Sequence, residues 1–270
     1  MHERLNALAH PKRLDLFRLL MRRYPDSVPA GQIAEALTLK LNTTSTYLNA
    51  LKAAGLIDQT RTGTSLQYNV NLPAVRDLFG GLLGDCCQNR PDLCLSMPRD
   101  SVTPNKGRKL NALFVCTGNS ARSIMAEAIL EKEGNGLFNS YSAGTVPSDN
   151  PHPEVLELLA QKGYDTSNLH SKPIDDFAAK DAPQMDFVFT VCDHAANETC
   201  PTWPGQPLSA HGGLADPVRA KGSDAQKQLA FQQAYGLLRN RITAFVSLPF
   251  ETLDRISLQH KVDDIGRMTN

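Results

Sequence analysis

The 270-residue sequence has few aromatic residues, no excess of charge and no long hydrophobic run. It contains a single tryptophan, and aromatic residues make up 6% of the chain. No apolar stretch approaches the roughly 20 residues that cross a bilayer, and the amino terminus lacks the apolar core of a signal peptide. We therefore expect a cytoplasmic protein that makes no membrane contact.

The cysteines are unevenly distributed along the chain. Of six cysteines, three lie close together as Cys86, Cys87 and Cys94, and the others are Cys116, Cys192 and Cys200. A reducing cytoplasm disfavours structural disulfides, so the cysteines call for a chemical explanation. Length favours two domains. Residues 1–97 are slightly basic and the remainder slightly acidic, which points weakly to nucleic acid for the first part.

The stretch 110–123 joins a strand, a tight loop and the start of a helix. An apolar run at 113–115 indicates a buried strand, and a loop at 118–120 precedes helical spacing. Such a junction collects backbone N–H groups into a nest for a tetrahedral oxyanion. We expect Cys116, at its lip, to be a thiolate stabilised by the helix dipole and by Arg122.

The first 80 residues predict a winged helix-turn-helix domain. The expected elements are a helix over 3–24 divided at Pro11, a helix over 30–39, a helix capped by 42–46 that ends at Gly55, and a hairpin of 56–60 and 65–70. We interpret 25–29 as a turn.

Three phrases in this region, 10–14, 32–35 and 51–57, resemble the arsenic-responsive repressor family (ArsR/SmtB type). The resemblance implies that the second helix enters the major groove of operator DNA. The implied DNA-binding residues are Thr43, Thr44, Ser45, Tyr47, Asn49 and, on the wing, Arg61. The alternative is that the threonines only cap a helix. Such domains dimerise, and an apolar stripe suits that role: Val75, Leu78, Phe79, Leu82 and Leu83.

The cysteine group Cys86, Cys87 and Cys94 follows this stripe. Three thiolates suit a thiophilic ion such as arsenite, whereas zinc prefers four ligands. The repressors' usual cysteine pair is missing from 31–37, and a subset of the family resembles this chain in its cysteine placement. We expect an arsenite inducer site here. The alternative is that these are incidental linker thiols.

A polar, proline-punctuated linker is expected at 96–109, which divides the chain into domains 1–95 and 110–270. The second domain alternates strands (110–115, 137–142, 185–191) with helices (122–133, 153–162, 223–246). Residues 247–267 are expected to form a last amphipathic helix, in which Leu253, Ile256 and Val262 keep helical spacing. Alternation predicts an α/β domain with a parallel sheet, whose ligands bind beyond the carboxyl ends of the strands. Cys116 and Cys192 both fall at such ends.

Motifs of the second domain resemble the thioredoxin-coupled arsenate reductases, which share the fold and P-loop of low-molecular-weight tyrosine phosphatases. The motifs are 115–127, 142–145, 190–193, 200–205 and 215–217. The resemblance implies an oxyanion loop formed by Thr117, Gly118, Asn119, Ser120, Ala121 and Arg122.

The resemblance also implies the roles of the catalytic residues. Cys116 attacks arsenic, Ser123 hydrogen-bonds its sulfur, Asn119 holds the loop and Asp216 is the general acid. Cys192 and then Cys200 carry the oxidation to thioredoxin. Asp193 and Glu198 are expected to oppose thiolate formation at the nearby cysteines unless dipoles or distance offset their charges. No tightly bound cofactor is expected.

Two other functions stay open: a tyrosine phosphatase with a regulatory module, and a repressor with an inactive reductase half. The acid loop lacks a Trp that often precedes Gly213 in the reductases, which bears on the alignment of Asp216. Asn119, Glu127 and Ser142 match a potassium site of some relatives. His194 and His211 are interpreted as solvent-facing or hydrogen-bonding histidines.

Overall fold

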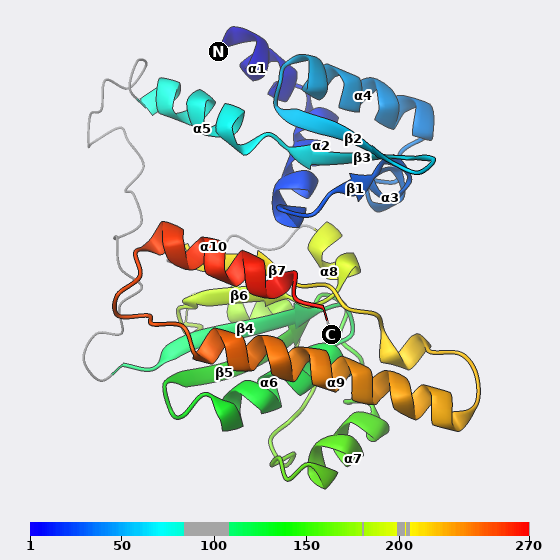
Figure 1. Ribbon diagram of the computed structural model, residues 1–270, viewed down its shortest axis with the longest axis vertical. Coiled ribbons are helices and arrows are strands. Elements are labelled where there is room, and N and C mark those ends of the chain that lie inside the picture. The colour runs from blue at the N-terminus through cyan, green and yellow to red at the C-terminus, as the bar shows by residue number, and fades with distance from the viewer. Residues whose placement is uncertain (84–107, 180, 199–202, 204–205, 270) are drawn as a thin grey trace. The chain divides into compact units, whose positions relative to one another are not determined.

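The computed structural model describes residues 1–83, 108–179, 181–198, 203 and 206–269. It divides into two compact units, Met1–Met97 and Pro98–Asn270 (Figure 1). Cys86, Cys87, Cys94 and Cys200 lie outside the described residues, as does most of the expected linker. Within the described part, no helix has the length and apolar character needed to cross a bilayer.

The first unit is a winged helix-turn-helix domain, as predicted. Its elements are α1 (His2–Leu8), α2 (Pro11–Arg23), β1 (Val28–Pro29), α3 (Ala30–Ala36), α4 (Leu41–Ala53), β2 (Ile57–Thr62), β3 (Ser65–Val70) and α5 (Leu72–Gly81). The strands form an antiparallel sheet in the order β1-β3-β2. Pro11 opens α2, and the His10 side chain caps that helix by accepting a hydrogen bond from the Lys12 amide at 3.2 Å.

The sequence did not predict β1, because a two-residue strand has no detectable period. The segment interpreted only as a turn pairs Val28 with Tyr68 of β3. Val28 is fully buried among Leu16, Leu20 and other core residues. Tertiary pairing, not local pattern, makes this strand.

Helix α4 begins earlier than expected, which overturns the capping interpretation. Its N-cap is Lys40, without a side-chain capping bond, so residues 42–46 lie inside the helix. Thr44 is 0% exposed and its Oγ1 donates to the Lys40 carbonyl at 3.2 Å. The prediction that Thr44 contacts DNA is therefore wrong, because its side chain points into the core.

The apolar stripe of α5 also divides differently than expected. Val75 and Leu78 belong to the core of the unit, at 4% and 2% exposure, whereas Phe79 is 52% exposed. A helix that packs on its own domain must bury one face there. Val75 and Leu78 are therefore not free to pair with a second chain.

The second unit is an α/β domain with a four-stranded parallel sheet in the order β5-β4-β6-β7. Its strands are β4 (Leu110–Cys116), β5 (Phe138–Gly144), β6 (Phe187–Thr190) and β7 (Leu208–His211). The helices are α6 (Arg122–Glu133), α7 (Pro153–Gln161), α8 (Asp193–Asn197), α9 (Asp224–Val246) and α10 (Arg255–Gly266), with 3₁₀ turns η2 (Ile174–Phe177) and η3 (Pro217–Arg219).

Aromatic packing fixes the long helix α9 on the sheet. Phe245 of α9 contacts Phe138 of β5 and Phe187 of β6, with ring centroids 5.2 and 5.0 Å apart. Helix α9 also packs against α6, and α10 packs against β7 (Figure 1). Strand β4 lies in the middle of the sheet, and all of its residues except Asn111 are buried.

The last helix is shorter than expected and faces differently. It begins at Arg255, where the Asp254 carboxylate accepts from the amides of Ile256 and Ser257 at 2.9 and 3.0 Å. Leu258 and Val262 are each 1% exposed, but Ile256 is 65% exposed. Ile256 was expected to share the helical face of Val262 and does not, because α10 packs against β7 and α9 through Leu258 and Val262.

Candidate active site at the carboxyl end of the parallel sheet

Cys116 ends β4 and lies at the base of the loop that precedes α6. Its side chain is buried, with Sγ 2.9 Å from Ser123 Oγ and accepting a hydrogen bond from the Asn119 amide at 3.2 Å. Hydrogen bonds to sulfur favour the thiolate. The strand, loop and helix start therefore hold this thiol as expected from the sequence.

Burial opposes this stabilisation. It raises the pKa of the Cys116 thiol, while the hydrogen bond from Ser123 and the charge of Arg122 act in the opposite direction. The expected thiolate stabilisation by Arg122 is thus present, but desolvation exceeds it in this form of the protein.

Asn119 holds the loop in a conformation that few residues adopt. Its φ is 44°, in the left-handed region. The side chain supports this geometry: Nδ2 donates to Ser123 Oγ and Ser142 Oγ, both at 2.8 Å, and Oδ1 accepts from the Lys172 amide at 2.7 Å. All three hydrogen bonds are buried or partly buried, so they fix the loop rather than contact solvent.

Arg122, at the first position of α6, is engaged with the acid loop. Its Nη2 donates to Asp216 Oδ2 at 2.9 Å and its Nη1 donates to the Leu214 carbonyl at 3.0 Å. Its Nε is buried and has no hydrogen-bond partner among the described residues. An oxyanion above Cys116 would supply that partner.

Cys192 follows β6 and precedes α8, so it lies at the neighbouring strand end. It is 1% exposed, its Sγ accepts from the Ala195 amide at 3.4 Å, and the Thr117 hydroxyl lies 3.5 Å from the same sulfur. The short helix and Thr117 therefore hold the second thiol beside the Cys116 loop.

These groups line one pocket of about 510 Å³. Its lining includes Cys116, Thr117, Gly118, Ser120, Ala121, Arg122, Cys192 and Asp216. Asn119 and Ser123 lie directly beneath the loop, both 0% exposed. All site residues expected from the sequence in this domain, except Cys200, are thus near one another in the described structure.

The two carboxylates expected to oppose thiolate formation each face a histidine. Asp193 Oδ1 lies 3.0 Å from His211 Nε2, and Glu198 Oε1 lies 2.7 Å from His194 Nδ1. His211 is buried at 3% exposure, so it is a hydrogen-bonding histidine rather than a solvent-facing one.

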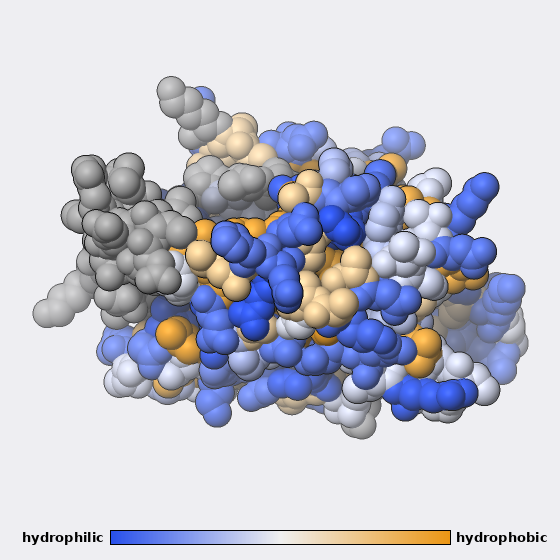
Figure 2. Space-filling model, turned by 90° about the horizontal axis from the view of Figure 1, so that it is seen from above, coloured by the Kyte–Doolittle hydropathy of each residue, from blue (hydrophilic) through white to orange (hydrophobic). Residues whose placement is uncertain are grey.

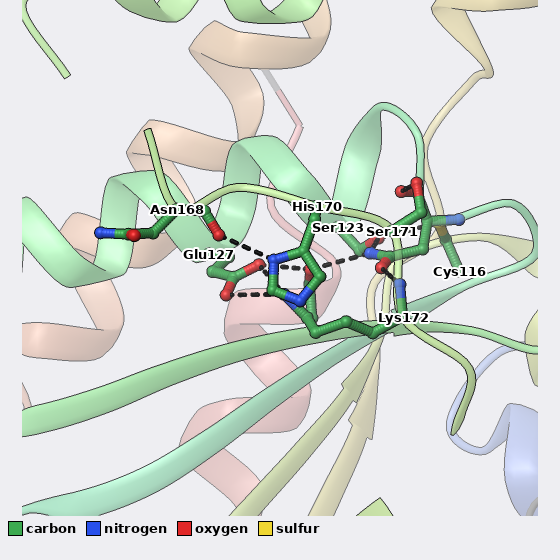
Figure 3. A network of polar contacts seen from close by, with 9 residues as sticks. Cys116, Ser123, Glu127, Asn168, His170, Ser171 and Lys172 are labelled. Atoms are coloured by element: carbon green, nitrogen blue, oxygen red, sulfur yellow. Dashed lines mark hydrogen bonds and ion pairs between the residues drawn. The ribbon is translucent and has the colours of Figure 1, made fainter. Parts of the chain in front are cut away.

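A polar network runs from Cys116 through Ser123 and Asn119 to Glu127 (Figure 3). Ser142 donates to the Glu127 carboxylate, and Lys172 Nζ lies 3.1 Å from both of its oxygens. Burial raises the pKa of Glu127, against the effects of Lys172 and Ser142. The ammonium group of Lys172 thus lies beside the carboxylate that a potassium ion would use, and the possible potassium site stays a prediction. The sequence did not reveal Lys172, which lies 45 residues from Glu127.

Gly212 occupies the place where the expected Trp is missing, and its surroundings explain the absence. A Cβ at Gly212 would lie 3.0 Å from Arg241 Nη1 and 3.2 Å from Gly266 Cα. Arg241 donates to the Gly212 carbonyl at 2.6 Å and to the Met268 carbonyl. Helices α9 and α10 therefore occupy the space of a larger side chain and hold the start of the acid loop themselves.

The exposed face of α4 is the candidate nucleic-acid surface of the first unit. Ser45 and Asn49 are exposed and Thr43 is half-buried, as is Tyr47, whose ring lies 4.9 Å from His10. The sequence interpretation missed three exposed residues on this face: Asn42, Thr46 and Lys52. Figure 2 looks down on the side of the unit that carries α1 and α4, where hydrophilic residues surround a smaller number of hydrophobic ones.

Comparison with known proteins matches both units. The low molecular weight phosphotyrosine protein phosphatase family matches residues 111–258, and a helix-turn-helix domain family matches residues 8–60. Arsenate reductases of Halalkalibacterium halodurans and Bacillus subtilis are each 35% identical over 132 residues, 49% of this chain and 91% of the relative.

A solved structure resembles the first unit. It is a homodimeric winged helix-turn-helix DNA-binding domain from Mycobacterium bovis, described as a possible ArsR-family transcriptional regulator. It is 27% identical, covers 33% of this chain and 83% of that one, and has a TM-score of 0.26. The family matches and the arsenate reductase relatives confirm the helix-turn-helix domain predicted for the first unit and the resemblance of the second unit to arsenate reductases with the fold of low molecular weight tyrosine phosphatases.

Proposed function

The chain belongs to the low molecular weight phosphotyrosine protein phosphatase family, and on this basis we propose that its second unit reduces arsenate to arsenite. One observation carries the proposal: a second buried thiol, Cys192, lines the same pocket as Cys116 and lies within 3.5 Å of Thr117 in the Cys116 loop. Phosphate ester hydrolysis needs one thiol, whereas a two-electron reduction needs a second to take up the oxidation.

The first step is attack on arsenate by the Cys116 thiolate. Arsenate, a tetrahedral oxyanion, is held by the loop amides of residues 117–122 and by Arg122, whose Nε is buried without a partner in the described structure. A Cys116–arsenic bond forms and an arsenic–oxygen bond breaks. Asp216, 2.9 Å from Arg122, donates the proton to the departing hydroxide.

The second step moves two electrons to arsenic. The Cys192 thiolate attacks Cys116 Sγ, a disulfide forms, and the sulfur–arsenic bond breaks with its electron pair going to arsenic, which leaves as arsenite. Cys200, outside the described residues, then attacks Cys192 and releases Cys116 as a thiolate. Thioredoxin, through its dithiol, reduces the Cys192–Cys200 disulfide.

We propose that the first unit binds operator DNA as a homodimer and that arsenite bound by Cys86, Cys87 and Cys94 weakens this binding. The helix-turn-helix match over residues 8–60 and the exposed polar face of α4 support the DNA-binding part. The proposed arrangement is a sensor domain 1–95, a linker 96–109 and a reductase domain 110–270, so that one half produces the ion that the other half senses.

The decisive experiment is arsenate-dependent oxidation of thioredoxin by the wild type and by Cys116→Ser, Cys192→Ser and Cys200→Ser variants. We expect turnover in the wild type and none in any variant. Phosphatase activity that is independent of Cys192, without arsenate turnover in the wild type, would favour the tyrosine phosphatase. Loss of both activities with intact operator binding would favour a repressor with an inactive reductase half.

A further inference from the structure

His211 lies buried at the end of β7, where it contacts two other elements. Its Nδ1 is 2.8 Å from Thr190 Oγ1 at the end of β6, and its Nε2 is 3.0 Å from Asp193 Oδ1 in α8. The His211 side chain is 1% exposed and that of Asp193 is 58% exposed. A neutral imidazole protonated at Nε2 donates to Asp193 and accepts from the Thr190 hydroxyl, so one tautomer satisfies both contacts.

The acid loop passes directly over this hydrogen bond. A Cβ at Gly213 would collide with Asp193 Oδ1 and lie 2.9 Å from His211 Nε2. The preceding residue, Gly212, is held at both of its backbone polar groups. Its carbonyl accepts a hydrogen bond from Arg241 Nη1 at 2.6 Å, and its amide donates to the Thr190 carbonyl at 2.9 Å. The backbone at 212–213 is therefore held in place above His211, and only glycine at 213 permits so close an approach.

Asp193 is one peptide unit from Cys192, so the position of its carboxylate constrains the position of the thiol. Helix α8 has only five residues, and so short a helix makes few internal hydrogen bonds and depends on outside contacts for its place. The bond to His211 is such a contact, on the side of α8 that faces β7.

We propose that His211 is a positioning residue that, through Asp193, aligns the Cys192 thiol for attack on Cys116. The proposal rests on the proposed function, in which Cys192 Sγ forms a bond to Cys116 Sγ as the bond from Cys116 to arsenic breaks. Displacements of about 1 Å in such an alignment can slow a step by up to ~10²-fold. The sequence motif explains Cys192 but not why a carboxylate follows it; the bond to His211 gives that carboxylate a function.

The test compares Asp193→Ala with Asp193→Asn, which retains an oxygen acceptor for His211. We expect Asp193→Ala to lower kcat for arsenate reduction about tenfold with an unchanged KM, and Asp193→Asn to stay within about twofold of the wild type. Hydrolysis of p-nitrophenyl phosphate, which uses Cys116 but not Cys192, should not change. Asp224→Ala is the matched control, because Asp224 also occupies the first position of a helix but is not paired with histidine.

A second readout is independent of arsenate chemistry. Diamide takes two electrons and two protons from two thiols, and the rate of Cys116–Cys192 disulfide formation is followed by peptide mass mapping in a Cys200→Ser background. We expect about tenfold slower formation with Asp193→Ala. An unchanged or faster rate, or an equal fall in phosphate hydrolysis, would overturn the positioning role. If the wild type reduces no arsenate, the proposed function fails. The effect of Asp193→Ala on the rate of disulfide formation with diamide still decides whether the His211–Asp193 contact positions Cys192.

Discussion

At the scale of single residues, the site combines a locally encoded thiol with partners from distant parts of the chain. Cys116, Asn119 and Ser123 lie within eight residues and contact one another directly. Burial raises the pKa of Cys116, and the Ser123 hydroxyl opposes that rise. The Ser123 hydroxyl therefore contributes to the reactivity of this thiol, and it can be removed without changing charge.

Replacing Ser123 by alanine should move the ionisation of Cys116 to higher pH. Because the Ser123 hydrogen bond lowers the thiol pKa, its loss raises that pKa further, so less thiolate is present at pH 7 and the deficit shrinks as pH rises. We expect alkylation of Cys116 by iodoacetamide, measured in a Cys192→Ser background, to slow about tenfold at pH 7. Ser140→Ala is the control, because the buried Ser140 Oγ has no partner among the described residues. An equal effect of both variants would contradict the prediction.

Lys172 should be required because Glu127 is buried. Lys172→Met leaves an uncompensated carboxylate and should cost about 1–3 kcal/mol of unfolding free energy at pH 7. Because burial raises the pKa of Glu127, the folded state binds the proton more tightly than the unfolded state. Stability is therefore lost as pH rises from the unfolded to the folded pKa, and the loss should be larger in the variant.

Urea unfolding at pH 5 and pH 8 measures this difference between Lys172→Met and the wild type. Adding Glu127→Gln to Lys172→Met should restore most of the lost stability, since an amide needs no cation. Potassium chloride and choline chloride should have equal effects on the wild type. A larger free energy of unfolding in potassium chloride than in choline chloride would indicate a potassium site beside Glu127.

At the scale of elements, helix α4 of the first unit buries some of its polar residues and exposes their neighbours. Turns of α4 alternate buried side chains, such as Thr44 and Leu48, with exposed ones, such as Ser45 and Asn49. A run of similar polar residues in the sequence is thus divided by helical geometry into a core face and a solvent face.

Substitutions on the solvent face of α4 should weaken operator binding, whereas a substitution on its core face should not. Ser45→Ala and Asn49→Ala should each weaken operator binding, by about 1 kcal/mol or more per lost base contact, without changing the unfolding midpoint. Thr44→Val should leave DNA affinity unchanged, because its side chain is buried. Fluorescence anisotropy, with an operator selected from random duplexes, measures affinity. Loss of binding in Thr44→Val with native stability would contradict the assignment.

At the scale of the whole molecule, the chain joins a helix-turn-helix domain to a domain of the low molecular weight phosphotyrosine protein phosphatase family. The proposal that arsenite made by the second domain is sensed by the first requires the two functions to be separable by mutation. The cysteines involved belong to different groups, so each can be removed without altering the other.

Cys86→Ser/Cys87→Ser should abolish release of operator DNA by arsenite while leaving arsenate-dependent oxidation of thioredoxin intact. Cys116→Ser should do the reverse: it should remain responsive to added arsenite but no longer respond to arsenate plus thioredoxin. DNA binding with each oxyanion, in both variants, provides the measurement. Arsenite-dependent release from the double cysteine variant would place the sensor elsewhere.

The sequence by itself determined both fold classes and the local chemistry of the Cys116 loop. Cys116, Asn119 and Ser123 contact one another within one strand–loop–helix junction, so their spacing in the sequence accounts for these contacts. The strand end at Cys192 could be inferred for the same reason, from the alternation of strands and helices.

Tertiary structure alone decided which distant groups meet. Arg122 contacts Asp216, Lys172 contacts Glu127, and His211 contacts Asp193, at separations of 94, 45 and 18 residues. These contacts join α6, α8, β7 and the loops around the sheet, and no local period in the sequence encodes them. Burial likewise removed Thr44 from the DNA-binding set and turned Ile256 to solvent, because packing, not composition, chooses which face of a helix is covered.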